Sequence, residues 1–415
     1  MRKMRDSGIE WIGTIPQDWQ LSKIGSLYTQ RNEKVSDKDY QPLSVTMQGI
    51  LPQLATAAKT DDGDNRKLVR VGDFAINSRS DRRGSCGISP LDGSVSLINI
   101  ILTPRTAMHP GYYNWLFHTT LFADEFYKWG HGIVADLWTT RWQEMKSITV
   151  PVPEYAEQER IAAFLDAECA EIDAVLEKTR ASIEEYKKLK QAIITQAVTK
   201  GIRGDRPMKD SGIEWIGDIP AEWDVIRVKQ LLKERNERSK EGKEEPLSMS
   251  QKVGLVPTKF LESIPNMASS FVGAKLAYVD DLVFNKLKAH LGVFSVSRYD
   301  GLVSPDYAVY CSTGKSNLKY LEYIFKTPQC IGEFRKKSTG IAAGLMRLYT
   351  EGLFSIYLPY PALNEQEEIA EYLNEKCAGI DALIVKKQQY LIEIENYKKS
   401  LIYEYVTGKK EVLPL

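Results

Sequence analysis

The residues best suited to chemistry in this chain are the basic and amide side chains of one segment, residues 66–84. Six arginines and lysines stand there against two acids, and the segment ends in glycine. Such side chains, presented from a glycine-containing loop, can donate hydrogen bonds to phosphate oxygens and to base edges. The alternative is a solvated hairpin that binds nothing. The candidate nucleic-acid contacts in this segment are Arg66, Lys67, Arg70, Asn77, Arg79, Arg82 and Arg83.

The overall charge does not favour a nucleic-acid binder, so such a role must rest on local charge. The 415 residues include 55 basic and 55 acidic side chains, a formal net charge of zero, whereas a strongly basic domain is the usual footprint of DNA binding. No run of eighteen apolar residues occurs, so we expect no membrane span. Five scattered cysteines without a C-x-x-C pair indicate reduced thiols and a cytoplasmic protein.

Catalytic motifs are missing from the sequence. Gly314-Lys315-Ser316 resembles the end of a phosphate-binding loop, but position 309 is valine where the first glycine is required. Pro305-Asp306 resembles the start of a nuclease carboxylate cluster, but no Glu-x-Lys follows it. The four histidines have no metal-ligand spacing, and no glycine motif for S-adenosylmethionine is present. We therefore expect a non-catalytic chain that carries no cofactor or metal of its own.

The sequence is a tandem duplication. The octapeptide DSGIEWIG occupies residues 6–13 and again residues 210–217. Matches continue at this offset of 204, and after a four-residue insertion they continue at an offset of 208. The last blocks include Glu157-Gln158-Glu159, which matches Glu365-Gln366-Glu367. A period of roughly 200 residues is far longer than a solenoid repeat and indicates a doubled domain pair.

Each copy has two parts of different texture. The first part mixes β-rich runs, such as 95–102 and 307–310, with a helical stretch at 112–126, which is typical of a compact α+β domain. From Pro153 to Lys200 no proline or glycine follows, and apolar residues recur every three to four positions. This predicts an amphipathic helix of about 44 residues, or about 66 Å. Acidic residues gather in the first half of this helix and basic residues in the second half, so the charges complement the positive and negative ends of the helix dipole.

A long amphipathic helix must bury its apolar stripe, and the second copy supplies an equivalent helix. We therefore predict an α+β protein with pseudo-two-fold symmetry, whose two helices form an antiparallel coiled-coil spacer between two globular domains. The expected boundaries are domain 1 at 1–153, helix 1 at 154–200, a linker at 201–209, domain 2 at 210–361, helix 2 at 362–408 and a tail at 409–415.

The remaining candidate contacts follow from the second loop of copy one and from the duplication. His131 and Arg141 belong to a glycine- and threonine-containing loop in copy one. Segments that differ between the copies but keep a polar, basic character are suited to reading different ligands. The corresponding candidates in copy two are Asn285, Lys286, Lys288, His290, Lys337, Ser338, Thr339 and Arg347. Asp280 replaces Gly72, which leaves open whether the two first loops share one geometry.

Several motifs together resemble one known family over nearly the whole chain. They are Glu10-Trp11-Ile12-Gly13 with Ile15-Pro16 and Trp19, Gly72-Asp73-Phe74 with Asn77 and Gly84, Gly132-Ile133, Pro151-Val152-Pro153, Glu157-Gln158-Glu159-Arg160-Ile161-Ala162 and Leu165-Asp166, each with a counterpart in copy two. This set resembles the DNA-specificity subunit of type I restriction-modification systems. The proline-flanked Glu-Gln-x-x-Ile-Ala block that enters the long helix is the most specific signal.

The resemblance implies two target-recognition domains that read the halves of a bipartite, asymmetric site in double-stranded DNA. It also implies two adenine-N6 methyltransferase subunits and restriction or translocase subunits as partners. S-adenosylmethionine, ATP and magnesium would then be bound by those partners. The alternative is a coiled-coil adaptor that holds two copies of a partner without reading DNA. The repeated octapeptide is expected to be structural, because an identical segment is poorly suited to reading two different half-sites.

Overall fold

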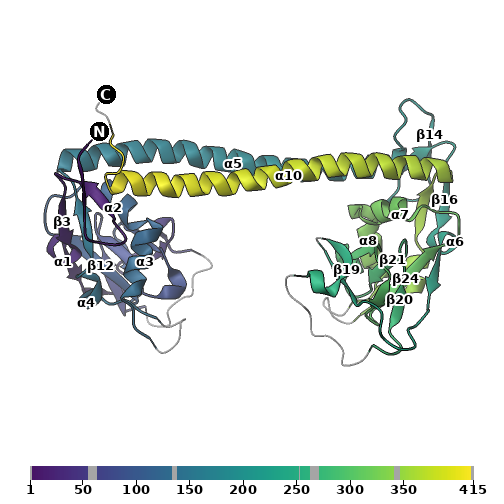
Figure 1. The fold of residues 1–415 in the computed structure, drawn as a ribbon, viewed down its shortest axis with the longest axis horizontal. Coiled ribbons are helices and arrows are strands. Elements are labelled where there is room, and N and C mark those ends of the chain that lie inside the picture. The colour runs from purple at the N-terminus through teal and green to yellow at the C-terminus, as the bar shows by residue number, and fades with distance from the viewer. Residues whose placement is uncertain are drawn as a thin grey trace. The chain divides into compact units, whose positions relative to one another are not determined.

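The computed structural model describes residues 2–54, 63–132, 138–251, 253–261, 271–340 and 346–412. The chain forms two compact units (Figure 1). Unit 1 contains residues 1–180 and 388–415, and unit 2 contains residues 181–387. Each unit therefore combines one mixed α/β domain with one half of each long helix. We call the α/β domains head 1 (residues 2–153) and head 2 (residues 208–361).

Head 1 is built on a four-stranded antiparallel sheet with the strand order β10-β9-β12-β4. Strand β9 is the most buried, and it pairs with β12 from Asn77↔Asn99 to Phe74↔Leu102. The elements of this half are β1 (Met4–Asp6), β2 (Thr14–Pro16), β3 (Gln20–Lys23), α1 (Ile24–Leu27), β4 (Tyr28–Arg31), β5 (Lys34–Val35), β6 (Leu43–Thr46), β7 (Gly49–Pro52), β8 (Arg66–Val69), β9 (Phe74–Asn77), η1 (Ser80–Arg82), β10 (Cys86–Ile88), β11 (Gly93–Val95), β12 (Asn99–Pro104), α2 (Pro110–Phe117), α3 (Thr120–Lys128), α4 (Trp142–Met145), β13 (Thr149–Val152) and α5 (Tyr155–Lys200).

Head 2 repeats this arrangement, with the sheet order β17-β24-β21-β22. Strand β21 pairs with β24 from Leu282↔Tyr310 to Asn285↔Tyr307. The elements of this half are β14 (Met208–Asp210), β15 (Asp218–Pro220), β16 (Asp224–Arg227), α6 (Val228–Leu231), β17 (Leu232–Arg235), β18 (Leu247–Ser250), β19 (Gly254–Pro257), η3 (Thr258–Phe260), β20 (Lys275–Ala277), β21 (Leu282–Asn285), η4 (Ala289–Leu291), β22 (Phe294–Val296), β23 (Gly301–Val303), β24 (Tyr307–Ser312), α7 (Leu318–Phe325), α8 (Pro328–Lys337), α9 (Thr350–Phe354), β25 (Tyr357–Tyr360) and α10 (Leu363–Val406).

The alternation of side chains along β9 gives head 1 two cores. Phe74 and Ile76 join the larger core, which includes the aromatic side chains of α2 and α3. Ala75 faces the other way and packs with Val69 and Val95 from the neighbouring strands β8 and β11. Because successive residues of a strand point to opposite faces, one buried strand holds both layers together.

Two sequence predictions differ from the structure in head 1. The single helical stretch predicted at 112–126 is two helices, α2 and α3, because the Thr119 hydroxyl accepts the backbone N–H of Phe122 and begins a new helix. The strand predicted at 95–102 is divided between β11 and β12. In both cases the hydrophobic pattern of the sequence continues across a point where the helix or strand ends and the next one begins.

The long helices α5 and α10 contact each other in antiparallel direction inside each unit. In unit 1, Lys398 Nζ bonds Asp173 Oδ1 at 2.6 Å and Arg180 bonds Glu395 at 2.6 Å. In unit 2, Lys190 Nζ bonds Asp381 Oδ2 at 2.6 Å. These pairs join the basic half of one helix to residues of the other helix. No helix among the described residues is long and apolar enough to cross a membrane.

The first turn of α5 is attached to head 1 by the Glu-Gln-Glu motif. The Glu157 carboxylate accepts a hydrogen bond from Trp19 Nε1 at 2.9 Å and forms an ion pair with Arg2. The Gln158 amide donates to the Pro153 carbonyl at 2.9 Å and accepts from the backbone N–H of His109 at 2.9 Å. A carboxylate here also benefits from the positive end of the helix dipole.

The same contacts attach α10 to head 2. Glu365 accepts a hydrogen bond from Trp223 Nε1 at 2.9 Å and pairs with Arg206. Gln366 donates to the Pro361 carbonyl at 3.0 Å and accepts from the backbone N–H of Asn317 at 3.0 Å. The block that identified the family resemblance in the sequence is therefore the joint between head and helix.

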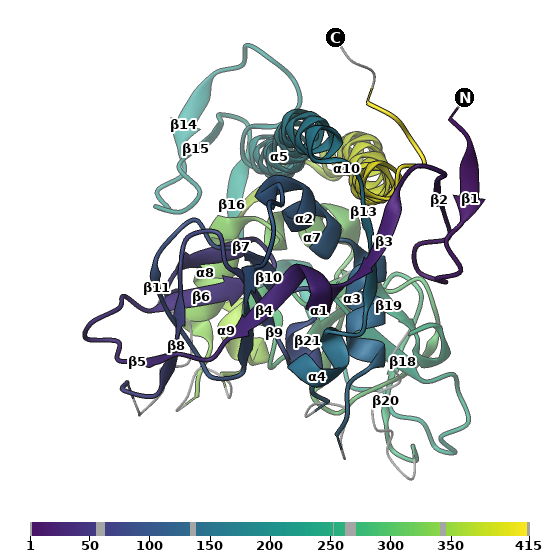
Figure 2. The same cartoon turned by 90° about the vertical axis from the view of Figure 1, so that its left-hand side faces the viewer.

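The repeated octapeptide seats head 1 on the C-terminal end of α10. Its turn is closed by Ser7 N–H donating to Gly13 O at 3.0 Å. Tyr403 and Lys409 both donate to the carbonyl of Ile12, at 2.9 Å and 2.6 Å. Trp11 is buried in the core of head 1. The ends of α5 and α10 lie next to α2 in both views (Figures 1 and 2), and Tyr112 of α2 donates to Val406 O at 2.8 Å.

The octapeptide of head 2 has an equivalent seat in unit 2. Ile216 and Ile219 share a core with Ile194 and Val198 from the C-terminal end of α5. Trp11 is buried in head 1, and the equivalent Trp215 is partly buried and packs against the core of head 2. The octapeptide is therefore a packing element, as the sequence comparison predicted.

Replacing Glu365 with leucine should test this joint. Trp223 Nε1 would lose its acceptor, and Arg206, whose side chain is 10% exposed, would lose its buried partner. We expect unit 2 to lose about 3 kcal/mol in free energy of unfolding, because breaking a buried pair leaves an uncompensated charge. Urea titration followed by tryptophan fluorescence measures this.

The matched control is Glu222→Gln, which removes the exposed partner of the same arginine and should leave the unfolding midpoint almost unchanged. Equal effects of the two substitutions would contradict a special role for Glu365.

Candidate nucleic-acid interface

Two loops that are distant in the sequence lie side by side in head 1. Loop A (residues 78–85) joins β9 to β10, and loop B lies between α3 and α4, with residues 129–132 and 138–141 described. The backbone N–H of Ser80 donates to Trp138 O at 3.0 Å, and that of Thr140 donates to Ser78 O at 3.0 Å. Both predicted candidate segments therefore contribute to one surface. Ile133, part of the predicted Gly132-Ile133 motif, lies outside the described residues, as does its counterpart Ile341.

This surface lies at the end of head 1 that faces away from the long helices. Helix α4 directly follows loop B, and both views place it on the opposite side of head 1 from α5 (Figures 1 and 2). The joint with the helices and the two loops are thus separate parts of the head.

A hollow of about 380 Å³ opens between the loops and the end of the sheet. Three predicted candidates line it from different elements: Lys67 from β8, Arg79 from loop A and Arg141 from loop B. Its full lining is Gln30, Lys67, Ser78, Arg79, Leu97, Ile98, Asn99, Ile100, Thr139, Thr140, Arg141 and Trp142. The fold thus brings together basic side chains that lie up to 74 positions apart in the sequence.

Lys67 is half-buried, and its ammonium group donates to Asn99 O at 2.7 Å. Burial lowers the pKa of Lys67, because a cation removed from water loses solvation. An anion in the hollow would recover part of that lost stabilisation. Arg79 is half-buried and Arg141 is exposed, so both guanidinium groups are available at the rim.

Arg66 is wrongly placed among the candidate contacts by the sequence. Its side chain is 3% exposed, and it donates to Ser94 Oγ at 2.8 Å and to Ser94 O at 2.9 Å. These bonds connect β8 to β11 inside the head. A basic residue in a charged run is therefore structural here, and we leave it out of the interface.

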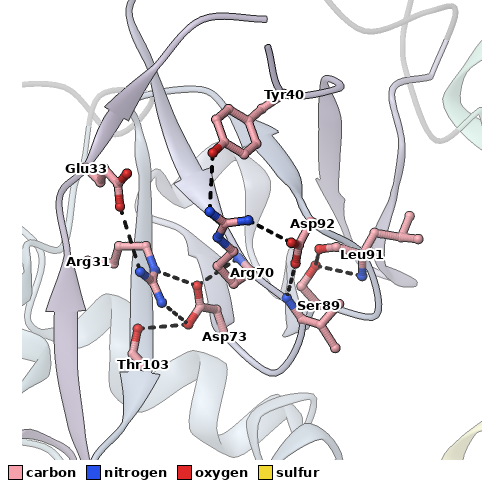
Figure 3. A network of polar contacts seen from close by, with 10 residues as sticks. Arg31, Glu33, Tyr40, Arg70, Asp73, Ser89, Leu91, Asp92 and Thr103 are labelled. Atoms are coloured by element: carbon pink, nitrogen blue, oxygen red, sulfur yellow. Dashed lines mark hydrogen bonds and ion pairs between the residues drawn. The ribbon is translucent and has the colours of Figure 1, made fainter.

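Arg70 belongs to a separate polar network at the other end of β8 (Figure 3). Its guanidinium group donates to Asp92 Oδ2 at 2.9 Å and to the Tyr40 hydroxyl at 3.2 Å. Its backbone N–H donates to the buried Asp73, which also accepts both Arg31 Nε at 2.8 Å and the Thr103 hydroxyl at 2.8 Å. Arg70 therefore lies apart from the hollow.

The Asp73 network recurs in head 2 and settles the geometry of the first loop. Asp281 accepts Arg235 Nε at 2.8 Å and the backbone N–H of Tyr278 at 2.9 Å. Gly72 has φ +86°, and Asp280 at the equivalent position has φ +66°. Both turns therefore use the left-handed region, and Asp280 is one of the residue types that tolerate it. The glycine-to-aspartate difference does not change the turn.

Asn77 and Asn285 shape loop A and its counterpart in head 2. Asn77 Oδ1 accepts the backbone N–H of Arg79 at 3.1 Å, and Asn285 Oδ1 accepts that of Leu287 at 3.1 Å. Asn77 is 6% exposed. The same side chain makes the same hydrogen bond in both heads. This structural role accounts for the asparagine at both positions, and no contact with a DNA base is needed to explain it.

The other candidates of head 1 lie at the surface. Arg83 is exposed, forms an ion pair with Asp124 of α3 and lies over the Tyr127 ring at 6.0 Å. Arg82 is also exposed, at 68% of its side chain. His131 is exposed, and its Nε2 lies 3.8 Å from Glu144. None of these three residues is among those that line the hollow.

In head 2 the equivalent loops are joined in the same way. Leu348 N–H donates to Lys286 O at 3.0 Å, and the backbones of Thr339 and Arg347 bond each other at 3.0 Å and 2.9 Å. The Arg347 side chain donates to Asp306 Oδ1 at 3.2 Å. Asp306, which the sequence marked as a possible start of a carboxylate cluster, therefore pairs with a cation. Of the remaining candidates, Lys288, Lys337 and Thr339 are exposed, and His290 and Ser338 are half-buried.

Sequence reasoning missed four residues of these sites. Gln30 and Asn99 line the hollow of head 1, and Glu234 and Lys275 stand in head 2 at the positions of Gln30 and Lys67. Lys275 Nζ lies 3.3 Å from Glu234 Oε1. The duplication contained the missing signal, because Lys275 aligns with Lys67 at the offset of 208 and Glu234 aligns with Gln30 at 204.

The chain is similar to specificity subunits of type I restriction enzymes. No family model matches it. It is 22% identical to the type I restriction enzyme MjaVIII specificity subunit of Methanocaldococcus jannaschii, over 96% of this chain and 94% of that protein. It is also 22% identical to the EcoDI specificity subunit of Escherichia coli, over 64% of this chain and 63% of that protein.

Two solved structures share the fold. A chain from a study of complex assembly and conformational transition of the type I R-M system has a TM-score of 0.73 at 13% identity, covering 95% of this chain and 99% of that one. The HsdS subunit from Thermoanaerobacter tengcongensis has a TM-score of 0.54 at 16% identity, covering 95% and 98%. The resemblance inferred from the motifs is confirmed.

Replacing Asn77 with alanine should separate a structural role from a reading role. The backbone N–H of Arg79 would lose its acceptor, so we expect a loss of about 1–2 kcal/mol in the free energy of unfolding. Thermal unfolding of the full chain measures this. The control Arg82→Gln changes an exposed side chain and should leave the unfolding temperature unchanged. A fully stable Asn77→Ala variant would contradict the structural role.

Proposed function

We propose that this chain, which is similar over nearly its whole length to specificity subunits of type I restriction enzymes, is a DNA-binding subunit that reads a bipartite, asymmetric sequence. Each head reads one half of the site through its loop surface. Lys67, Arg79, Arg82, Arg83, His131 and Arg141 are the proposed contacts of head 1. Those of head 2 are Lys286, Lys288, His290, Lys337, Ser338, Thr339 and Arg347.

One observation carries this proposal: the two heads agree at the helix joint and differ at the loops. The joint uses the same tryptophan, glutamate, glutamine and arginine in both units. Around the hollow, Gln30, Arg79 and Arg141 of head 1 correspond to Glu234, Leu287 and Tyr349 of head 2. A common frame with two different surfaces is what reading two unlike half-sites requires.

The long helices fit the role of an antiparallel coiled-coil spacer. The ion pairs of Lys398 with Asp173 and of Lys190 with Asp381 support this pairing, one within each unit. A spacer of fixed length would set the number of base pairs between the two half-sites, as half-site spacing does in other DNA-binding proteins.

The proposed partners supply the chemistry. We infer two adenine-N6 methyltransferase subunits, which would bind S-adenosylmethionine, and restriction or translocase subunits, which would use ATP and magnesium. The chain itself is proposed to be a non-catalytic cytoplasmic subunit that directs these partners to the site.

Deleting the gene and sequencing the host DNA for N6-methyladenine tests the function. We expect one split motif to lose its methylation, and the intact gene supplied on a plasmid should restore it. An unchanged methylation pattern would sink the proposal. A purified complex without salt-dependent DNA affinity would instead favour the adaptor alternative.

Exchanging head 2 tests whether each head reads its half of the site independently. Residues 210–361 would be replaced by the corresponding segment of a similar subunit with a different motif, keeping the joint residues Trp223 and Glu365. We expect one half of the methylated motif to change and the other half and the spacing to persist, because head 1 and both helices are untouched. Changes in both halves would rule out independent reading.

A further inference from the structure

The hollow of head 1 is strongly cationic. Lys67, Arg79 and Arg141 supply three positive charges, and none of its twelve described lining residues carries a carboxylate. Within the part of the chain that the structure describes, none of the three cations has a carboxylate within ion-pair distance. Glu144 accepts the backbone N–H of Arg141 at 3.0 Å and lies 3.8 Å from His131.

The two side-chain amide oxygens that line the hollow, those of Gln30 and Asn99, are engaged or covered. Asn32 Nδ2 donates to Gln30 Oε1 at 3.2 Å, and Asn99 Oδ1 is buried from solvent. A base edge is recognised by donors and acceptors together, whereas a phosphate needs donors and positive charge alone. The accessible groups of this hollow therefore fit a phosphate better than a base.

Head 2 neutralises the same position internally. Glu234 stands where head 1 has Gln30, and its carboxylate lies 3.3 Å from Lys275 Nζ, the counterpart of Lys67. The other carboxylate oxygen accepts the Thr350 hydroxyl at 2.6 Å. Leu287 and Tyr349 replace the two arginines. Arg347 donates to Asp306 at 3.2 Å. Lys286, at the position of Ser78, donates to the Pro305 carbonyl at 3.2 Å.

We propose that the hollow of head 1 binds one backbone phosphate of DNA through Lys67, Arg79 and Arg141, and that Glu234 occupies the equivalent position in head 2. The inference rests on the proposed function and adds a physical difference between the heads. Head 1 gains affinity from a buried phosphate contact, whereas head 2 binds without one at this position.

The test introduces into head 1 the carboxylate that Glu234 provides at the equivalent position of head 2. In Gln30→Glu the new carboxylate should pair with Lys67, as Glu234 pairs with Lys275. Binding of the full chain, with its methyltransferase partners, to a duplex containing the methylated motif would be followed by fluorescence anisotropy at several salt concentrations. We expect about tenfold weaker binding and a salt slope reduced by about 0.9, the value for one phosphate. The methylated motif should stay unchanged.

Three further variants make the test decisive. Gln30→Met keeps the size without the charge and should leave the salt slope unchanged. Glu234→Gln frees Lys275 in head 2 and should not lower the slope. Arg141→Gln removes an exposed cation, so it should fold normally and lower the slope by about 0.9, even if Gln30→Glu proves unstable.

The outcomes separate the inference from the function. An unchanged slope in Arg141→Gln, or in a folded Gln30→Glu variant, would overturn the phosphate site while the methylated motif still supports DNA reading. A changed motif in either variant would mean that the hollow reads a base. A wild-type complex without salt-dependent binding would overturn the proposed function itself.

Discussion

The structure depends on one carboxylate at the start of each long helix, buried in unit 2 and half-buried in unit 1. Glu157 and Glu365 each hold an indole N–H and a guanidinium group of the head, at the positive end of a helix dipole. Such a pair is costly to desolvate and is stable only when its geometry is well satisfied. Its orientation is consequently well defined, and the direction in which the head leaves the helix is defined with it.

A rigid joint allows the far end of each head to vary. The strand β9 and its partner β12 connect the joint side of head 1 to loops A and B, and the Asp73 network fixes the ends of these strands. The same framework in head 2 ends in loops of different charge. The two heads therefore share a fold but differ in the charge around the hollow. Head 1 presents Lys67, Arg79 and Arg141 there without a carboxylate among the described lining residues, whereas head 2 pairs Lys275 with Glu234 and Arg347 with Asp306.

The large elements were predictable because their signals are periodic or repeated. The apolar spacing after Pro153 predicted α5, and the duplication predicted that two similar heads exist. The hollow was not predictable, since Lys67, Arg79 and Arg141 come from three segments that only tertiary folding brings together. The sequence also did not show which basic side chains are buried. Arg66 and Lys67 are adjacent bases in the sequence, but strand alternation turns Arg66 into the head and Lys67 towards the hollow.

The octapeptide also has a consequence for how such a chain can evolve. It sits at the entrance of each head and packs against a helix end in both units, so the two copies are interchangeable as seats. Recombination within this short identical stretch would exchange a head together with the long helix that follows it, because the stretch lies at the start of each repeat. The incoming segment would carry the same seat as the segment that it replaces.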